Sequence, residues 1–357
     1  MKTQLNWRNT TAIGLGLMAM TFTSCKKDST ETPTAKKSYG ANISNIGTNV
    51  ITETYKELAA KSAILYSEVV KLKDNQSASN LDIARGAWRD SRAPWEKSEG
   101  FLFGPVDTKG IDPAIDSWPV NKIDLDAVLA GSDALTESFI DALAGELKGF
   151  HTIEYLLWGG TGNKQVGDFT AREFEYLLSV TENLKNKTKV LADSWDPSGE
   201  NFVKNLTEAG TSSSIYLTQK SALQELVQGM IGIADEVANG KINDPLSQQD
   251  LSKEESQFSH NSKNDFANNI RSISNVYNGK FNVNGLGIYD VVKESDQNLA
   301  DRLNDEINAA ITAIDNIPGT FSDAVFNNQA AVNEAKDKIT VIQTTLESEI
   351  LPMINNL

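Results

Sequence analysis

The sequence predicts an all-α protein made of two tandem helical bundle domains, with irregular loops at a cleft between them. Apolar residues recur at helical spacing in nearly every segment beyond residue 42, and few segments alternate with period two. The last two long helices are joined by a short Pro318-Gly319 turn, which is typical of the antiparallel hairpins found in bundles. We therefore expect no sizeable β-sheet.

The length of the chain and its helix-breaking proline and glycine residues predict four parts. Beyond an N-terminal signal about 330 residues remain, which is enough for two domains. The strongest boundary signal is the segment from Trp195 to Gly199, where proline and glycine interrupt the helical pattern. We predict a signal peptide at 1–24, a flexible tether at 25–42, an N-terminal helical bundle at 43–197 and a C-terminal helical bundle at 198–357.

The N-terminal segment predicts a lipoprotein. A basic start precedes the apolar run 12–20, which is too short to span a bilayer and fits a secretory signal core. The run leads to Ser24-Cys25 in a context that resembles a lipobox, so we expect lipidation of Cys25, the only cysteine. The alternative is a free, buried cysteine in an uncleaved segment. Lys26 favours the outer membrane, on its periplasmic or its surface face, with contact through the lipid anchor only.

Charge and motifs exclude several classes of function. The formal net charge is −15, and no block of Lys and Arg is long enough to follow a phosphate backbone, so we expect no nucleic-acid partner. Cysteine catalysis is excluded because no thiol follows Cys25. The sequence also lacks the H-E-x-x-H zinc motif, the G-x-S-x-G nucleophile elbow and a glycine-rich phosphate loop.

In the N-terminal half, apolar spacing predicts helices separated by one irregular insert. The first helix runs from about residue 50 to 72, and the second, capped by Ser79 or Asn80, runs to Trp95. From 100 to 119 the chain stays apolar but contains many Gly and Pro residues, which predicts an ordered loop of the kind that often carries function. Further helices are expected at 125–129, 133–158 and 174–191.

The C-terminal half repeats this organisation. A long helix is expected from Tyr216 to Val237, where Asn239-Gly240 should stop it. An irregular polar region from Asp244 to Asn264 follows, then a helix at 266–276 and a loop at 279–287. The final hairpin should pair a helix at 288–314 with one that starts at Ser322.

The segment Gly149-Phe150-His151-Thr152-Ile153-Glu154 carries the most informative pair of residues. His151 is one of only two histidines, and on a helix it lies on the same face as Glu154. An imidazole and a carboxylate among apolar residues form half of a plausible metal site. A satisfied core histidine paired with a carboxylate is the structural alternative, because a spacing of two ligands arises easily by chance.

Three other stretches contain candidate site residues. On the helix that ends near residue 99, Arg92 and Glu99 lie beside tryptophans and would need partners if buried. In the loop 112–118, a turn explains Asp112 adequately but leaves Asp116 open. The polar stretch 254–266 contains the other histidine, and it either caps the next helix or contributes to a site through Glu255, Ser259 and His260.

Several stretches in the same order resemble the imelysin family, whose signature is the G-x-H-x-x-E motif. The resemblance covers nearly the whole chain beyond the signal, and one such motif alone would be weak. The stretches are Trp88 to Pro119, Gly149-Phe150-His151-Thr152-Ile153-Glu154-Tyr155-Leu156-Leu157, Ile231-Gly232-Ile233-Ala234-Asp235-Glu236 and Glu255 to Asn278.

The resemblance implies two helical bundle domains, with the motif helix near a cleft between them. It also implies a secreted or lipid-anchored bacterial protein connected with iron uptake, and a classification among metallopeptidases. His151 and Glu154 correspond to the probable metal ligands of the family. A hydrolytic zinc needs about three protein ligands and a base. Further ligands would have to come from Glu99, Asp116, Glu255 or His260.

Two functions remain open at this point, with a third, plainer one. The first is a lipid-anchored protein that binds iron, another metal or an iron-carrying ligand for an uptake system; residue types do not choose between iron and zinc. The second is a zinc-dependent metallopeptidase that uses His151 and Glu154, with Glu255 as a ligand or base. The third is binding of a peptide or small ligand in the cleft without metal. We rank binding above catalysis because no recognisable set of water-activating residues is present.

Overall fold

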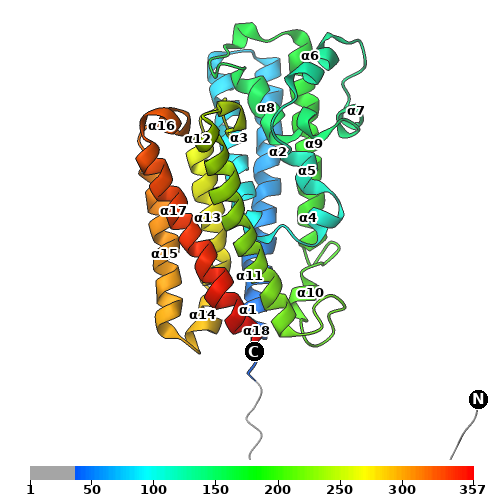
Figure 1. Ribbon diagram of the computed structural model, residues 1–357. Coiled ribbons are helices and arrows are strands. Elements are labelled where there is room, and N and C mark those ends of the chain that lie inside the picture. The colour runs from blue at the N-terminus through cyan, green and yellow to red at the C-terminus, as the bar shows by residue number, and fades with distance from the viewer. Residues whose placement is uncertain (1–36) are drawn as a thin grey trace, which may run out of the picture. The chain divides into compact units, whose positions relative to one another are not determined.

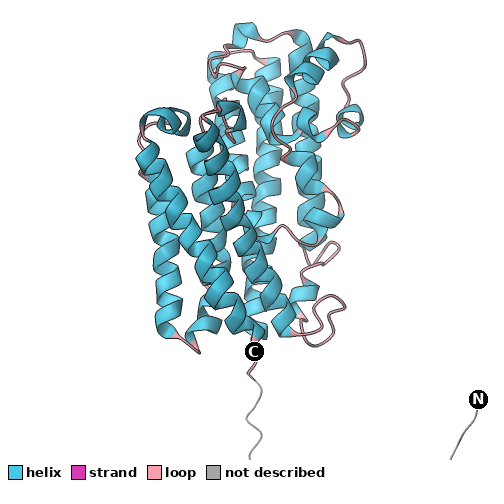
Figure 2. Cartoon of the chain, viewed as in Figure 1, coloured by secondary structure: helices cyan, strands magenta, loops and turns pink. Residues whose placement is uncertain are grey.

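The structure, a computed structural model, describes residues 37–357 and confirms the all-α prediction. No strand occurs among these residues (Figure 2). Within the same range, no helix combines the length and apolar character needed to cross a bilayer. The predicted signal peptide, Cys25 and the predicted tether up to residue 36 lie outside the described residues, and the last residues of the predicted tether, 40–42, begin the first helix.

The helices follow one another along the chain with short connections, and Figure 1 labels most of them. The α-helices are α1 (Gly40–Asn45), α2 (Glu53–Asp74), α3 (Ala78–Glu96), α4 (Pro105–Thr108), α5 (Ile111–Ile115), α6 (Lys122–Ala130), α7 (Glu137–Asp141), α8 (Gly149–Trp158), α9 (Ala171–Trp195), α10 (Lys204–Thr207), α11 (Gln219–Asp235), α12 (Asn243–Gln248), α13 (Ser262–Asn278), α14 (Ile288–Lys293), α15 (Gln297–Asp315), α16 (Phe321–Asn327), α17 (Gln329–Thr345) and α18 (Leu351–Asn355). Segments of π-helix lie at Ile46–Thr52, Glu236–Ile242 and Leu346–Ile350, and 3₁₀ turns at Glu99–Phe101, Gly145–Leu147, Val166–Asp168 and Leu251–Lys253.

The long helices form two groups that pack against each other. In the first group α2 packs on α3 and α9, and α8 packs on the same two helices. In the second group α13 and α17 each pack on α11 and α15 (Figure 1). Contacts of α3 with α13, and of the 99–101 turn with α11, join the groups, and residues 38–357 form one compact unit. Division into two domains at residue 197, with a cleft between them, stays a prediction.

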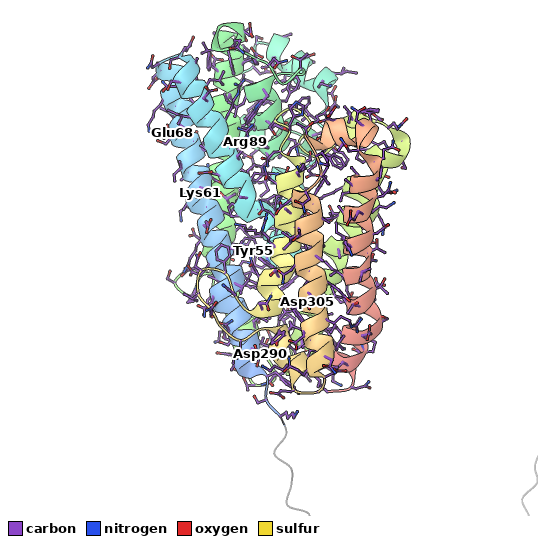
Figure 3. All side chains as sticks on the ribbon, turned by 90° about the vertical axis from the view of Figure 1, so that its left-hand side faces the viewer. Tyr55, Lys61, Glu68, Arg89, Asp290 and Asp305 are labelled. Carbon is purple, nitrogen blue, oxygen red and sulfur yellow. The ribbon has the colours of Figure 1, made fainter. Side chains whose placement is uncertain are left out.

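Apolar residues at helical spacing account for the packing of each long helix. On α15 and α17 the buried positions step by three or four residues and meet across the predicted hairpin. Polar side chains occupy the outer faces, as Lys61 on α2 and Asp305 on α15 illustrate (Figure 3). The start of α9 has a capping box, in which Thr170 and Glu173 bond each other's backbone N–H groups.

Several predicted boundaries were wrong. The cap of α3 is Ser77 rather than Ser79 or Asn80. The predicted helix 133–158 is divided into α7, a 3₁₀ turn and α8, and the predicted helix 288–314 is divided into α14 and α15. The predicted partner helix is interrupted at Asn328, between α16 and α17. The interruption of the helical pattern from Trp195 to Gly199 and the loop at 279–287 were confirmed, because α9 ends at Trp195 and no helix lies between α13 and α14.

The error with the largest consequence concerns Asn239-Gly240, which do not stop the helix. The chain continues from α11 through the π-helix Glu236–Ile242 directly into α12. Asn239 and Gly240 lie within this wider π turn instead of ending the helix, and such turns are frequent at functional sites. It also turns Lys241 inward, where its side chain is almost completely buried.

Candidate functional site

Gly149 places the motif helix against the loop that carries Asp116. Its φ is +75°, and a Cβ there would lie 2.2 Å from the carbonyl oxygen of Ile115, so no larger residue fits. This close approach brings the first turn of α8 against the end of α5, where Asp116 is the C-cap. The glycine of the motif therefore sets the position of His151 relative to Asp116.

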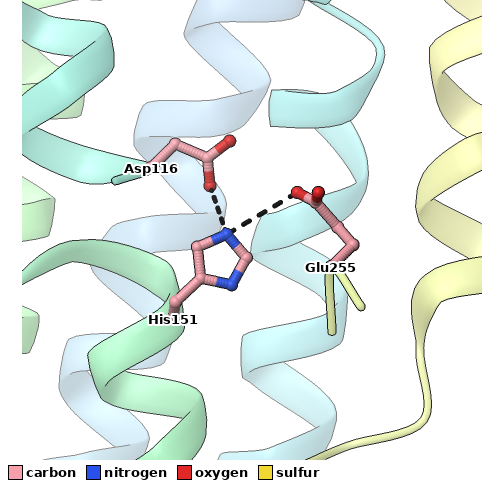
Figure 4. Close-up of side chains that lie close together, drawn as sticks. All are labelled: Asp116, His151 and Glu255. Carbon is pink, nitrogen blue, oxygen red and sulfur yellow. Dashed lines mark ion pairs between the residues drawn. The ribbon is translucent and has the colours of Figure 1, made fainter. Parts of the chain in front are cut away.

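Three potential ligand atoms converge from three separate parts of the chain (Figure 4). His151 Nε2 lies 3.2 Å from Asp116 Oδ1 and 3.6 Å from Glu255 Oε1. His151 comes from α8, Asp116 from the end of α5, and Glu255 from the segment after the 251–253 turn. All three side chains are at least nine-tenths buried.

The guanidinium of Arg92 contacts all three of these atoms. One of its terminal nitrogens donates to Asp116 Oδ1. The other donates to Glu255 Oε1 at 2.5 Å and lies 3.4 Å from His151 Nε2. The side chain of Arg92 is fully buried, so its charge requires these partners.

Arg92 has two more carboxylate neighbours. Glu96 Oε1, one helical turn along α3, lies 2.5 Å from the terminal nitrogen of Arg92 that also contacts Glu255. Asp265 Oδ1 on α13 lies 3.8 Å from Arg92 Nε, too far for a hydrogen bond. Both Arg92 Nε and Glu96 Oε1 are buried without a hydrogen bond of good geometry.

A second buried cation, Lys241, lies next to this arrangement. Its Nζ is 2.8 Å from Glu99 Oε2 and 3.4 Å from Glu255 Oε1. Asn269 on α13 donates to Glu99 Oε2 at 2.9 Å and to Glu96 Oε2 at 2.5 Å. Lys241 and Asn269 thus connect the acids of the 96–99 stretch to the second group of helices.

Glu154 is engaged differently from the other motif residue. Its Oε1 accepts three hydrogen bonds, from the N–H of Phe258 at 3.1 Å and from the N–H and Oγ of Ser259 at 2.8 and 2.7 Å. Its Oε2 lies 3.8 Å from His151 Nδ1, and both of these buried atoms lack a hydrogen bond. Glu154 therefore ties α8 to the segment that carries Glu255.

Burial and charge pairing shift the pKa values of different acids in the cluster in opposite directions. Burial, with repulsion from nearby carboxylates, raises the pKa of Glu99 and of Asp265 well above the usual range. At Glu255 burial acts in the same direction, but Lys241, His151 and Arg92 outweigh it and lower the pKa to about 2. The acid that faces His151 therefore stays ionised, as a ligand must.

His151 is held in its charged form by its neighbours. Burial and the charge of Arg92 lower its pKa, but the carboxylates of Asp116, Glu154 and Glu255 more than offset them, so the pKa is raised well above the usual value. A metal binds the neutral imidazole, so metal binding at Nε2 would displace a proton.

The donor set fits a transition metal. Ligands at about 2.1 Å from one tetrahedral ion lie roughly 3.4 Å apart. The two separations from His151 Nε2, 3.2 and 3.6 Å, bracket this value. One imidazole and two carboxylates are ligands that iron and zinc both accept. The residues Asp116, His151 and Glu255 would hold the ion, which would supply Lewis-acid or redox chemistry. A second acidic group, Glu96, Glu99 and Asp116, lies beside it.

The structure brings together most of the residues that the sequence singled out. Arg92, Glu99, Asp116, His151, Glu154, Glu255 and Ser259 all belong to the buried cluster. His260 does not: it is exposed, with a φ of +55°, and its Nδ1 lies 3.0 Å from Ser322 Oγ. Its predicted part in a metal site has no geometric support.

Sequence reasoning missed four members of the cluster: Glu96, Lys241, Asp265 and Asn269. Glu96 had a usable signal, because it follows Arg92 by four residues on a helix. Lys241 had none, because the preceding Asn-Gly is typical of a helix end. Asp265 and Asn269 lie in a polar stretch that is equally typical of a solvated helix.

Comparison with known proteins places the chain among its relatives. A model of the Imelysin family (peptidase M75) matches residues 51–348. The chain belongs to the Imelysin family. Iron-regulated protein A of Synechococcus elongatus is 29% identical over 352 residues, which cover 96% of this chain and 94% of the relative. The expected family was thus confirmed.

Solved structures agree with this family assignment. A putative iron-regulated protein A precursor from Parabacteroides distasonis is 27% identical with a TM-score of 0.80, covering 90% of this chain and 97% of that chain. An imelysin-like protein from Psychrobacter arcticum is 16% identical with a TM-score of 0.71, covering 88% of this chain and 94% of that chain, and shows similarity of fold alone. The helical architecture is therefore that of other imelysin-like proteins.

Proposed function

We propose that this protein binds a transition-metal ion, iron in the first place, at Asp116, His151 and Glu255. The observation that carries the proposal is the convergence of one imidazole nitrogen and two carboxylate oxygens in a buried site. Such a set provides three protein ligands and leaves further positions for water or a carried ligand.

The charge of the cluster supports binding of a cation. The buried carboxylates Glu96, Glu99, Asp116, Glu154, Glu255 and Asp265 outnumber the permanent cations Arg92 and Lys241. An excess of buried negative charge is expensive unless it is protonated or paired with a cation. The raised pKa values of Glu99 and Asp265 and the charged imidazole of His151 supply this compensation without metal, and a bound metal ion would replace the positive charge that His151 loses with its proton.

The relatives favour iron over zinc. Two similar proteins bear the name iron-regulated protein A, which for those proteins states a connection with iron. We propose the same connection here, in a cell-envelope lipoprotein anchored through Cys25 to the outer membrane, where it would serve an iron-uptake system. Fractionation of cells that express the Cys25→Ser variant tests the anchor, because the variant should leave the membrane fraction.

The alternative function, a zinc-dependent metallopeptidase, has less support from the geometry. Glu154 would have to act as a ligand or base, yet its Oε1 already accepts three hydrogen bonds from Phe258 and Ser259. His151 is 1% exposed, which leaves a peptide bond no approach in this conformation. Chelator-sensitive cleavage of an unfolded protein, lost in Glu154→Gln, would favour the peptidase over our proposal.

Calorimetric titration with Fe²⁺ without oxygen, and separately with Zn²⁺, tests the proposal. We expect the purified protein to bind about one ion of either metal per chain, and we propose that iron is the metal bound in the cell. His151→Ala should abolish this binding, because it removes the only nitrogen ligand. His260→Asn is the matched control: it removes the other histidine, and asparagine tolerates the positive φ at this position.

The two variants separate a specific site from diffuse attraction by an acidic protein. If wild type and His151→Ala bind the metal with equal stoichiometry and affinity, the assignment of the site to His151 is wrong. Loss of binding in His260→Asn alone would move the site to the exposed histidine. An absence of binding for both metals in the wild-type protein would overturn metal binding as the function.

A further inference from the structure

Arg92 holds the ligand atoms that the proposed metal would need. Its two terminal nitrogens contact Asp116 Oδ1 and Glu255 Oε1, and one of them lies 3.4 Å from His151 Nε2. We propose that Arg92 is a displaceable internal counter-ion, which keeps the ligand set assembled without metal and must move when metal binds. This inference rests on the proposed metal site and assigns a regulating residue to it.

Competition follows from the chemistry of the guanidinium. An arginine keeps its charge at every physiological pH, so it cannot leave the ligands by losing a proton. A carboxylate oxygen that binds a metal at about 2.1 Å cannot keep a second cation in short contact along the same direction. Arg92 and the metal therefore compete for Asp116 Oδ1 and Glu255 Oε1.

The structure provides Arg92 with partners to which it can turn. Glu96 Oε1 lies 2.5 Å from a terminal nitrogen, and Asp265 Oδ1 lies 3.8 Å from Nε. Arg92 Nε makes no hydrogen bond and can therefore gain one, and Glu96 Oε1 is already an ion-pair partner that Arg92 can keep as it leaves the ligands. A change of side-chain rotamer toward these two acids would release the ligands and keep the guanidinium paired.

Lys241 is the counter-ion that stays. Its shortest contact is with Glu99 Oε2 at 2.8 Å, outside the proposed ligand set. Its contact with Glu255 Oε1, at 3.4 Å, is longer than that of Arg92. The two cations therefore differ in role: Lys241 neutralises the acids of the 96–99 stretch, and Arg92 neutralises the ligands themselves.

Metal titration of Arg92 variants tests this role. We expect Arg92→Gln to bind Zn²⁺ or Fe²⁺ at least about tenfold more tightly than the wild type, because a competing charge has gone. Arg85→Gln is the matched control, since Arg85 lies on the same helix but contacts none of the proposed ligands. Its partners are the carbonyl oxygens of Leu157 and Lys164, the carboxylate of Asp82 and the ring of Trp158. The affinity of this variant should equal that of the wild type.

The outcomes distinguish this inference from the metal site itself. If the wild type binds metal and Arg92→Gln binds equally or more weakly, the counter-ion role is overturned and the metal site stands. If neither protein binds either metal, the metal site fails and the inference fails with it. Binding by Arg92→Gln alone would support the inference in its strongest form.

A second measurement does not depend on whether Arg92→Gln folds. The wild-type protein, labelled with ¹⁵N-arginine, is titrated with Zn²⁺, and the Nε–H resonance of Arg92 is identified by its absence in Arg92→Lys. We expect this resonance to move when zinc binds, because Nε gains a hydrogen bond to Asp265, whereas that of Arg85 stays in place. A fixed Arg92 resonance in the zinc-saturated protein would overturn the proposal.

Discussion

Two buried regions of this protein are built on opposite principles. The α15–α17 hairpin buries Leu303, Ile307 and Ile314 against Val332 and Ile339, all 0% exposed. The cluster around Arg92 buries charged side chains to the same extent. The hairpin gains free energy from every apolar contact, at about 25 cal/mol per Å². The cluster must offset the desolvation of each ion before it gains anything.

The difference indicates which region exists for stability and which for function. Replacing a buried ion network by well-packed apolar residues is often neutral or stabilising. A fold in which the α3–α13 junction resembled the hairpin would therefore be at least as stable. Stability does not explain the cluster, whereas the proposed binding of a cation would.

The largest effect should come from leaving one buried charge without its partner. Lys241→Met removes the ammonium 2.8 Å from Glu99 Oε2 and should destabilise the protein by about 3–5 kcal/mol, measured by urea unfolding. The double variant Lys241→Met, Glu99→Leu should recover part of this loss, because the buried acid nearest to the ammonium has gone as well and the remaining neighbours Glu255 and Glu96 keep Arg92 as a partner.

The matched control for that experiment is Lys338→Met, on the exposed face of α17, which should change stability by less than about 0.5 kcal/mol. A double variant at least as unstable as Lys241→Met alone would break the comparison, since the pair would then be a source of stability.

A smaller effect of a different kind is expected in the hairpin. Ile339→Ala leaves a cavity in a fully buried apolar seam and should cost about 2–4 kcal/mol of unfolding free energy. The neighbouring exposed Thr340→Ala serves as control. The loss at Ile339 should be the same with and without added Zn²⁺, because this seam has no part in the proposed metal site. A dependence on zinc would couple the two regions.

The smallest effect concerns Asp112, at the edge of the cluster. Burial, with repulsion from Asp116, raises its pKa from 3.8 to about 6. Because folding favours the protonated acid, this contribution to stability is complete below 3.8 and is lost as the pH rises through about 6. Asp112→Asn should therefore be more stable than wild type by about 1 kcal/mol near neutral pH.

Unfolding by urea at about pH 4 and about pH 7.5 measures this difference. The stabilisation by Asp112→Asn should shrink toward zero at the lower pH, where the wild-type acid is largely protonated in the folded protein. A constant difference across the range would show that Asp112 is not penalised by its charge.

Much of the site could be predicted because the relevant residue types are rare or stand out from their neighbours. His151 is one of two histidines. Arg92 is a charged residue on an apolar helix face, so it requires a partner when it is buried. Glu255 was one of several candidate ligands, and the sequence could not choose among them. It follows Arg92 by 163 residues, and no local pattern records which loop packs on which helix.

Two further features differ from what the neighbouring residues suggest. Asn239-Gly240 has the composition of a helix end, yet a π turn carries the helix through it and buries Lys241. Glu154 has the spacing of a metal ligand, yet the backbone of Phe258 and Ser259 occupies its Oε1. In both cases distant parts of the chain overrule the nearest-neighbour preference.

The sequence by itself determined the helical class, the terminal hairpin, the family and the identity of the motif pair. Each of these depends on periodicity or on residue type, which are properties of neighbours along the chain. Tertiary structure alone decided that Arg92 lies among Asp116, His151 and Glu255, and that Glu154 ties α8 to the 258–259 segment. Burial at the junction of α3, α8 and α13 is the reason, because a charge that is buried there must find its partner within the protein.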